Sequence, residues 1–135
     1  MKKKIAIVSS NFLSIKSFLS KSVEELSKNN SVYIYTNANK HDNIFTNSNI
    51  KLINLPITRN VNLLNDLQCF IKLLFLIFKL KPDIVFTITP KGGLLGILTS
   101  FILNIRIRIH YYTGQVWVTR KGIVKKLLKY IDKII

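Results

Sequence analysis

"PDIVFTITPKGG" (82–93) places an almost uninterrupted apolar run between two prolines. Residues 83–89 have the length and the β-branched composition of a strand. A strand with so little polar alternation is typical of the middle of a parallel sheet that is covered on both faces. Pro90 ends this strand, and Gly92 and Gly93 open a helix. The stretch therefore predicts a buried strand, a tight turn and a helix.

Similar units extend to both sides of this stretch. Short apolar strands are predicted over 4–9, 31–36, 50–56 and 105–112. Helical spacing predicts one helix after Ser14 as the N-cap, running to about residue 26, and another over 62–80 that Pro82 stops. Alternating strands and helices of this size predict an α/β fold, a Rossmann-like doubly wound parallel sheet, in a single domain over 1–135.

The charge of the chain is strongly positive. Lys and Arg number 21 against 6 Asp and Glu, a net charge of +15. Such a field favours anionic partners, although the lysines could equally serve only to keep an apolar protein in solution. The cations are spread over many predicted elements and no nucleic-acid motif is present, so we do not expect nucleic acid as a partner. Cys69 is the only cysteine, which excludes an internal disulfide and a cysteine-based metal site.

The last segment, 121–135, predicts a basic amphipathic helix. One arc of its helical wheel is apolar and holds Ile123, Val124, Leu127, Leu128, Ile131, Ile134 and Ile135. Lys125, Lys126, Lys129 and Lys133 lie opposite. Such a helix could lie on anionic lipid headgroups, or it could cover the sheet with its apolar side and expose its lysines. No run of apolar residues reaches the roughly 20 that a membrane-spanning helix needs.

Ligands of doubly wound sheets bind at the carboxyl ends of the strands, near the point where the strand order reverses. Three loops belong to that edge: 9–14, 89–93 and 113–122. Their candidate substrate-binding residues are Ser10, Asn11, Lys91, Gly92, Gly93, Thr113, Gly114, Gln115, Trp117 and Arg120. Glycines and free amides at a helix start favour an anion, to which Lys91 would add a mobile charge. Equally, the glycines could serve close packing, and Trp117 could anchor a core instead of stacking on a sugar.

The chemistry of these loops indicates binding more than catalysis. His110, near Thr113 and Arg120, is only a weak candidate for a catalytic residue, and a structural role is its alternative. No pair of carboxylates is expected near the three loops, no spacing of metal ligands is present, and neither the Walker nor the dinucleotide glycine pattern occurs. Gln115, Thr113 and Arg120 can donate to hydroxyls and phosphates, so a sugar-phosphate-like or lipid-phosphate ligand is predicted.

Residues 82–135 carry a family resemblance, mainly in "TPKGGLLG" (89–96) and "RIHYYTGQVWVTRKG" (108–122). They resemble the second half of the N-terminal domain of bacterial family 4 glycosyltransferases, the retaining enzymes of capsule, O-antigen and exopolysaccharide synthesis. The resemblance implies a two-domain GT-B architecture, in which this chain forms the acceptor side and a C-terminal domain binds the nucleotide-sugar donor. It also implies glycan acceptors on polyprenyl diphosphate and a peripheral position on the cytoplasmic face of the membrane.

The sequence departs from that family in two loops and in length. "SSNFLS" (9–14) stands where many members have a glycine-rich loop, and Thr113 stands where many have a histidine directly before the glycine, with His110 three residues earlier. No donor domain follows, so we expect a truncated enzyme that is inactive alone. The alternatives are a non-catalytic membrane-docking subunit of a split GT-B enzyme and a fragment of a GT-B-fold sugar-nucleotide epimerase. No cofactor is expected in this chain beyond the donor of the complete enzyme.

Overall fold

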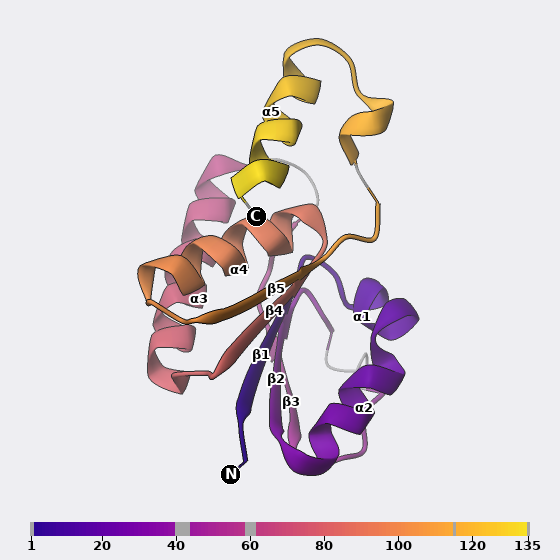
Figure 1. The fold of residues 1–135 in the computed structure, drawn as a ribbon, viewed down its shortest axis with the longest axis vertical. Coiled ribbons are helices and arrows are strands. Elements are labelled where there is room, and N and C mark those ends of the chain that lie inside the picture. The colour runs from indigo at the N-terminus through magenta and orange to yellow at the C-terminus, as the bar shows by residue number, and fades with distance from the viewer. Residues whose placement is uncertain (1, 40–43, 59–61, 115, 135) are drawn as a thin grey trace.

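The computed structural model describes residues 2–39, 44–58, 62–114 and 116–134. Its strands form one five-stranded sheet in the order β3-β2-β1-β4-β5, and every neighbouring pair is parallel (Figure 1). The strands are β1 (Lys4–Ser9), β2 (Ser31–Thr36), β3 (Ile50–Asn54), β4 (Ile84–Ile88) and β5 (Ile107–Tyr111). The helices are α1 (Phe12–Phe18), α2 (Ser20–Asn29), α3 (Leu63–Leu80), α4 (Pro90–Ile102), the 3-10 turn η1 (Val116–Thr119) and α5 (Gly122–Ile134).

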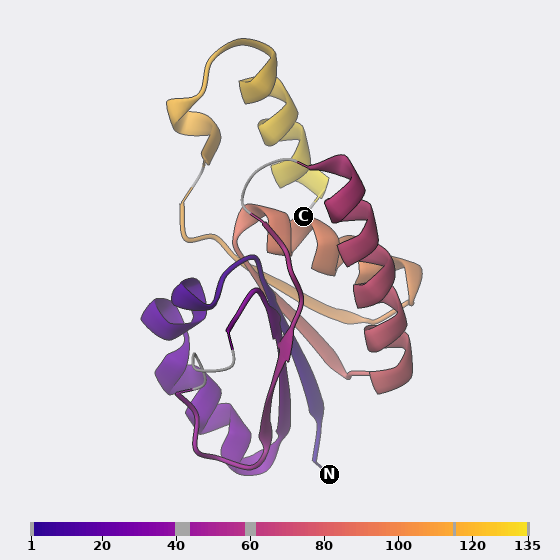
Figure 2. The same ribbon diagram turned by 180° about the vertical axis from the view of Figure 1, so that it is seen from behind.

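The order in which strands are added to the sheet reverses between β3 and β4, while all the strands stay parallel. The chain first builds outward from β1 to β2 and β3, then crosses back to place β4 and β5 on the other side of β1. Because such crossovers are right-handed, α1 and α2 cover one face and α3 and α4 the other (Figures 1 and 2). The predicted Rossmann-like doubly wound α/β fold is therefore confirmed.

Two apolar cores lie on the two faces of the sheet. Successive strand residues point to opposite faces, so Ile7 packs under α1 and α2 with Ile15 and Ile34, while Val8 packs under α3 with Leu73. Both residues of β1 are almost fully buried, at 2% and 0% exposure. Burial on both faces explains why the central strands lack polar alternation.

The first helix differs from its prediction. Asn11, not Ser14, is the N-cap: its Oδ1 accepts the Ser14 N–H at 2.9 Å and the Ser14 hydroxyl at 3.0 Å. The helix then breaks at Leu19, whose φ of −123° is not helical, and α2 begins at Ser20. The N–H of Leu19 still bonds to Ile15 and its carbonyl to Val23, so the chain bends there without losing either hydrogen bond.

The remaining elements lie close to their predicted bounds. Asn62 caps α3 by accepting the Asn65 N–H at 3.2 Å, and Lys81 ends that helix in the left-handed conformation just before Pro82. β3 and β4 are each two residues shorter than predicted, and β5 is three residues shorter. Pro90 lies inside α4, at its first position, because a missing N–H costs nothing there.

Candidate functional site

The carboxyl ends of β1, β4 and β5 meet at one edge of the sheet, as the three-loop prediction requires. In the register of the sheet Ser9 pairs with Ile88, and Ile88 pairs with Tyr111. The loops that follow these strands therefore begin at the same level. The N-termini of α3 and α4 lie at this edge too (Figure 1).

Thr89 joins the loops after β1 and β4. Its Oγ1 accepts the Ser10 N–H at 3.0 Å, and its carbonyl accepts the Gly93 N–H at 2.7 Å. Thr89 has a φ of 75°, a conformation that a β-branched residue adopts only when its surroundings enforce it. Ser10 itself is only 5% exposed, so this predicted binding residue contributes chiefly its backbone to the edge.

Gly92 provides room for α4 to approach β1. A Cβ at this position would lie 2.9 Å from the Ser9 Cα, 2.9 Å from the Thr89 Oγ1 and 3.1 Å from the Val8 carbonyl. Backbone atoms cannot move aside as a flexible side chain does, so no larger residue fits without a shift of the helix. This favours the close-packing role for Gly92, which the sequence left open beside a ligand-binding role.

Asn11 presents a polar group without an internal partner. Its Oδ1 caps α1, but its buried Nδ2 has no hydrogen-bond partner among the described residues. A buried amide donor without a partner is costly, and a ligand oxygen at the edge would satisfy it. Asn11 is therefore a candidate binding residue with a specific unpaired donor, where the sequence offered only its position.

Lys91 is not the mobile charge that the sequence predicted. Its Nζ lies 2.8 Å from the Asp66 Oδ1, and the two side chains are only 15% and 19% exposed. Asp66 comes from the first turn of α3, 25 residues earlier in the chain. An ion pair held between two helix N-termini is preorganised, since both partners are already desolvated and oriented.

Two single carboxylates contact residues of these loops, whereas the sequence prediction concerned only a pair of carboxylates. Asp66 pairs with Lys91 after β4, and Asp132 of α5 accepts the Trp117 indole N–H at 2.7 Å. Sequence reasoning missed both because one precedes the strand by a whole helix and the other lies near the last residue. Only the folding of α3 and α5 onto this edge brings them there.

His110 forms a half-buried cluster on β5. Its Nδ1 lies 2.8 Å from the Thr87 Oγ1, and its ring makes an edge-to-face contact with Tyr112 at 4.4 Å. The Thr87 Oγ1 also lies 3.3 Å from the Ile109 carbonyl, so the hydroxyl is within hydrogen-bond distance of both the ring and the backbone of β5. Burial lowers the pKa of His110, while the charge of Asp132 acts in the opposite direction.

The segment after β5 folds back on α5. The Trp117 indole is covered by Lys129, whose Nζ lies 4.4 Å from the ring centroid, and by Lys125 at 5.9 Å. Tyr112 adds a hydrogen bond from its hydroxyl to the Asp132 carbonyl at 3.0 Å. One face of the indole and its N–H are therefore occupied within the chain, which favours an anchoring role for Trp117 over stacking on a sugar.

The other predicted residues of this loop remain exposed. Thr113, Gly114 and Arg120 are exposed. Gln115 lies outside the described residues. The Ser10–Thr89 hydrogen bond joins the loop of Ser10 and Asn11 to the loop of Lys91, Gly92 and Gly93. The other three residues lie in the loop after β5.

The part of the chain that the structure describes holds no cluster of three or more His, Cys, Asp and Glu that could bind a metal ion. What the edge offers instead is the Asn11 amide, the helix N-terminus of α4 and the Lys91–Asp66 pair. Hydrogen-bond donors and a cation at a helix N-terminus are suited to hydroxyl and phosphate oxygens. These groups make this edge the candidate functional site of the described chain.

Fold and edge together define a Rossmann-like domain of the kind that forms half of GT-B proteins. The chain belongs to the glycosyl transferase 4-like family, whose model matches residues 4–135. It is 35% identical over 107 residues to the capsular polysaccharide biosynthesis glycosyltransferase CapM of Staphylococcus aureus. That match covers 79% of this chain and 28% of the relative, so the chain spans little more than a quarter of the relative's length.

Two solved structures share the fold at low sequence identity. The UDP-GlcNAc 2-epimerase of Methanocaldococcus jannaschii matches with a TM-score of 0.63 and 16% identity, over 97% of this chain and 37% of its own. MurG of Acinetobacter baumannii matches with a TM-score of 0.61 and 13% identity, over 96% of this chain and 39% of its own. At these identities both likenesses establish the fold alone.

Proposed function

We propose that the chain is the acceptor-side domain of a retaining glycosyltransferase of surface polysaccharide synthesis. It would hold a glycan acceptor, carried on a polyprenyl diphosphate, while a second domain supplies the nucleotide-sugar donor. The 35% identity to a capsular polysaccharide glycosyltransferase is the observation that carries this proposal. The edge formed by Asn11, Lys91 and Gly92 supports it, because an amide donor, a cation and a helix N-terminus suit hydroxyl and phosphate oxygens.

The position in the cell that we propose is the cytoplasmic face of the membrane, where lipid-linked acceptors are presented. The net charge of +15 supports contact with anionic headgroups. Among the described residues no helix is long and apolar enough to cross a bilayer. Contact with the membrane would then be peripheral.

The experiment is a binding test with the chain itself. Short-chain polyprenyl-diphosphate monosaccharides and, separately, UDP-GlcNAc are titrated while backbone amide NMR signals are followed. We expect the lipid-linked sugars to shift the amides of Asn11, Lys91 and Gly92, and UDP-GlcNAc alone to shift none. Shifts with UDP-GlcNAc only, or shifts remote from this edge, would contradict the proposal.

A matched variant separates binding from folding. Asn11→Asp keeps the Oδ1 that caps α1 but replaces the Nδ2 donor by oxygen. We expect it to weaken acceptor binding by roughly tenfold, as the loss of one hydrogen bond to a buried donor predicts. Asn29→Asp, at an exposed position of α2, is the control and should bind as the unchanged chain does.

An epimerase function is distinguished by the same reagents. An epimerase acts on the nucleotide sugar without an acceptor, so conversion of UDP-GlcNAc to its 2-epimer by the chain would contradict the transferase proposal. A docking subunit of a split enzyme makes a different prediction. It would bind lipid-linked sugars alone and support transfer only when a separately produced donor domain is added.

A further inference from the structure

The side of α3 that faces away from the sheet is apolar along its whole length. On the side of α3 that faces the sheet, the side chains of Cys69, Leu73 and Ile77 are buried. The exposed side, which we name the α3 stripe, consists of Leu64, Leu67, Ile71, Phe75 and Phe78. Phe75 is 63% exposed and Phe78 61%, although surface helices normally expose polar residues here. No packing within the described chain accounts for this face.

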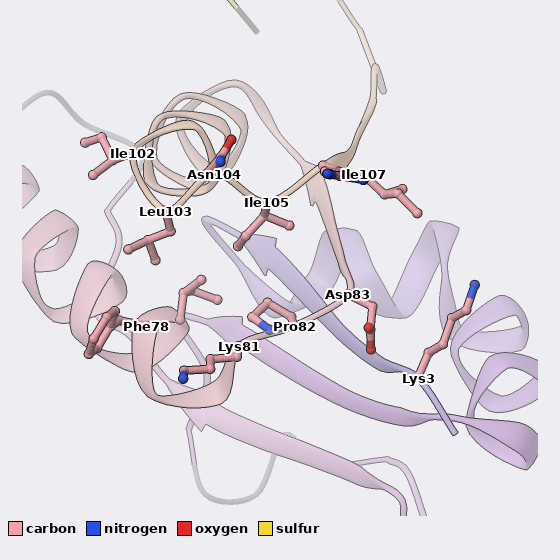
Figure 3. A pocket seen from close by; sticks show the side chains of 12 residues that line it. Lys3, Phe78, Lys81, Pro82, Asp83, Ile102, Leu103, Asn104, Ile105 and Ile107 are labelled. Atoms are coloured by element: carbon pink, nitrogen blue, oxygen red, sulfur yellow. The ribbon is translucent and has the colours of Figure 1, made fainter. Parts of the chain in front are cut away.

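The apolar surface continues from α3 onto the end of α4. Phe78 and Ile102 line one open pocket of about 810 Å³ between the two helices, with Leu103 and Ile105 deeper in it (Figure 3). Phe101 of α4 is also 67% exposed. Contiguous exposed aromatic and aliphatic side chains of this kind mark a contact surface.

Cations border this surface. Lys72 and Lys79 flank the α3 stripe along the helix, and both are exposed. Lys3, Lys81 and Arg106 line the pocket (Figure 3). The Arg108 guanidinium lies 5.6 Å from the centroid of the Phe101 ring.

Acids are scarce on the same side. Among the residues of α3 and α4 the only acidic one is Asp66, whose carboxylate is held by Lys91. Both glutamates of the chain, Glu24 and Glu25, lie on α2, on the other face of the sheet. Asp83 also lines the pocket, beside the cations Lys3, Lys81 and Arg106. The α3 side is therefore apolar in the middle, with more cations than acids around it.

This charge pattern favours an anionic lipid surface over a second copy of the chain as the partner of the apolar surface. A second copy of the chain would bring Lys72 and Lys79 against the same lysines and would add to a repulsion between molecules of net charge +15. An anionic lipid surface takes up apolar side chains to a depth of about 5–10 Å and neutralises the flanking cations. The 18 residues of α3 would lie along such a surface for about 27 Å.

We propose that the α3 stripe docks the chain on an anionic membrane surface, with Lys72 and Lys79 at the headgroups. This inference deepens the peripheral membrane position proposed above by naming the surface, and it replaces α5 as the principal contact. It also orients the molecule: Asp66 in the first turn of α3 holds Lys91, so docking of α3 keeps the candidate site beside the bilayer.

The test is flotation of the chain with vesicles of phosphatidylcholine and phosphatidylglycerol in equal parts, compared with pure phosphatidylcholine. Ile71→Gln with Phe75→Gln interrupts the α3 stripe at exposed positions, and glutamine is a good helix former. Leu13→Gln with Phe18→Gln on α1, exposed to 65% and 54%, is the matched control. Lys126→Gln with Lys133→Gln removes the exposed charge of α5 instead.

We expect the unchanged chain and the α1 variant to float with anionic vesicles, and the α3 variant to lose at least tenfold in partitioning. The proposal would be overturned if the α3 variant floated undiminished, or if only the α5 variant lost binding. It would equally be overturned if the unchanged chain were a dimer by light scattering that the α3 variant dissociated, since a second copy would then cover the stripe.

A second measurement identifies the part of the chain that enters the lipid without comparing the vesicle affinities of variants. Ile71→Cys or Leu13→Cys is labelled with an environment-sensitive fluorophore; Cys69 is 2% exposed and burial raises the pKa of its thiol, so the new cysteine reacts first. A blue shift on anionic vesicles at position 71 but not at 13 is expected. No shift at 71 while the chain floats would refute docking by α3. Because neither measurement involves sugar transfer, the proposed enzymatic function can fail or stand independently.

Discussion

At the scale of single residues, the site depends on the partners that each side chain already has within the chain. Lys91 becomes a fixed charge because Asp66 reaches it from the start of α3. The Asn11 Oδ1 is used as a helix cap, and its Nδ2 has no hydrogen-bond partner among the described residues. In both cases the partner of the residue determines whether it can bind a ligand, and residue type alone does not.

The Lys91–Asp66 pair is expected to contribute to stability. In a double-mutant cycle of Lys91→Met and Asp66→Asn, followed by urea unfolding, we expect a coupling free energy of about 1–3 kcal/mol, because both side chains are largely buried. The Lys28–Glu25 pair, with side chains 64% and 73% exposed, is the control and should couple by less than about 0.5 kcal/mol. Equal couplings for the two pairs would contradict the role given to burial.

His110 should make stability depend on pH. Burial lowers its pKa in the folded state below the ordinary value of 6.5, so the unfolded chain binds more protons in the interval between the two values. The free energy of unfolding should therefore rise with pH through that interval, and the contribution should be lost as pH falls through the folded pKa. His110→Gln should flatten this rise in urea titrations. An NMR titration in which the His110 ring shows a pKa above 6.5 would show that Asp132 outweighs burial.

At the scale of elements, α5 and η1 form a unit held by its own contacts. The indole of Trp117 lies under Lys129 and donates to Asp132, and Tyr112 binds the Asp132 carbonyl. Of the apolar arc predicted for the last helix, the side chains of Val124, Leu127, Ile131, Ile134 and Ile135 lie outside the described residues. The described contacts are those of its basic side, on which Lys125 and Lys129 cover the indole and Lys126 and Lys133 are exposed.

Asp132→Ala should release this unit. Trp117 is the only tryptophan, so its fluorescence reports the contact directly. We expect a red-shifted emission and stronger acrylamide quenching in Asp132→Ala, with little change in the unfolding midpoint, because the unit lies outside the two cores of the sheet. Asp83→Ala, at the amino edge of the sheet, is the control. An unchanged Trp117 spectrum in Asp132→Ala would mean that the hydrogen bond does not hold η1 on α5.

At the scale of the whole molecule, charge and apolar surface are unevenly distributed. The two glutamates lie on the α1–α2 side, while the α3–α4 side exposes large apolar residues with cations around them. The carboxyl edge between these sides holds the candidate site. A chain with this distribution has a preferred orientation toward an anionic surface.

The net charge should destabilise the folded state by self-repulsion. Added NaCl screens that repulsion, so the urea midpoint should rise between low salt and about 0.5 M NaCl, where the Debye length falls well below 10 Å. A variant with Lys16, Lys21, Lys126 and Lys133 replaced by Gln should show a smaller rise. A midpoint that falls with salt in the unchanged chain would show that attractive pairs outweigh the repulsion.

Local patterns in the sequence were sufficient for the strands, most helices and the edge at which the site lies. The apolar run at 83–89 and the turn at Pro90 report burial and chain direction, which are properties of neighbouring residues. The N-cap was misplaced at Ser14 because Asn11 and Ser14 are both good caps, and the choice depends on which residue leaves β1 in an extended conformation. Family membership was also readable, from residues 82–135.

Contacts between distant segments were decided only by the tertiary structure. The pairing of Lys91 with Asp66 and of Trp117 with Asp132, and the close approach of Gly92 to Ser9, join residues from different elements. The sequence of α3 shows a helix that is apolar almost all round, but not which side the sheet would bury. Packing buried Leu73 and Ile77 and left Phe75 and Phe78 outside, because a helix on a sheet can present only one side to it.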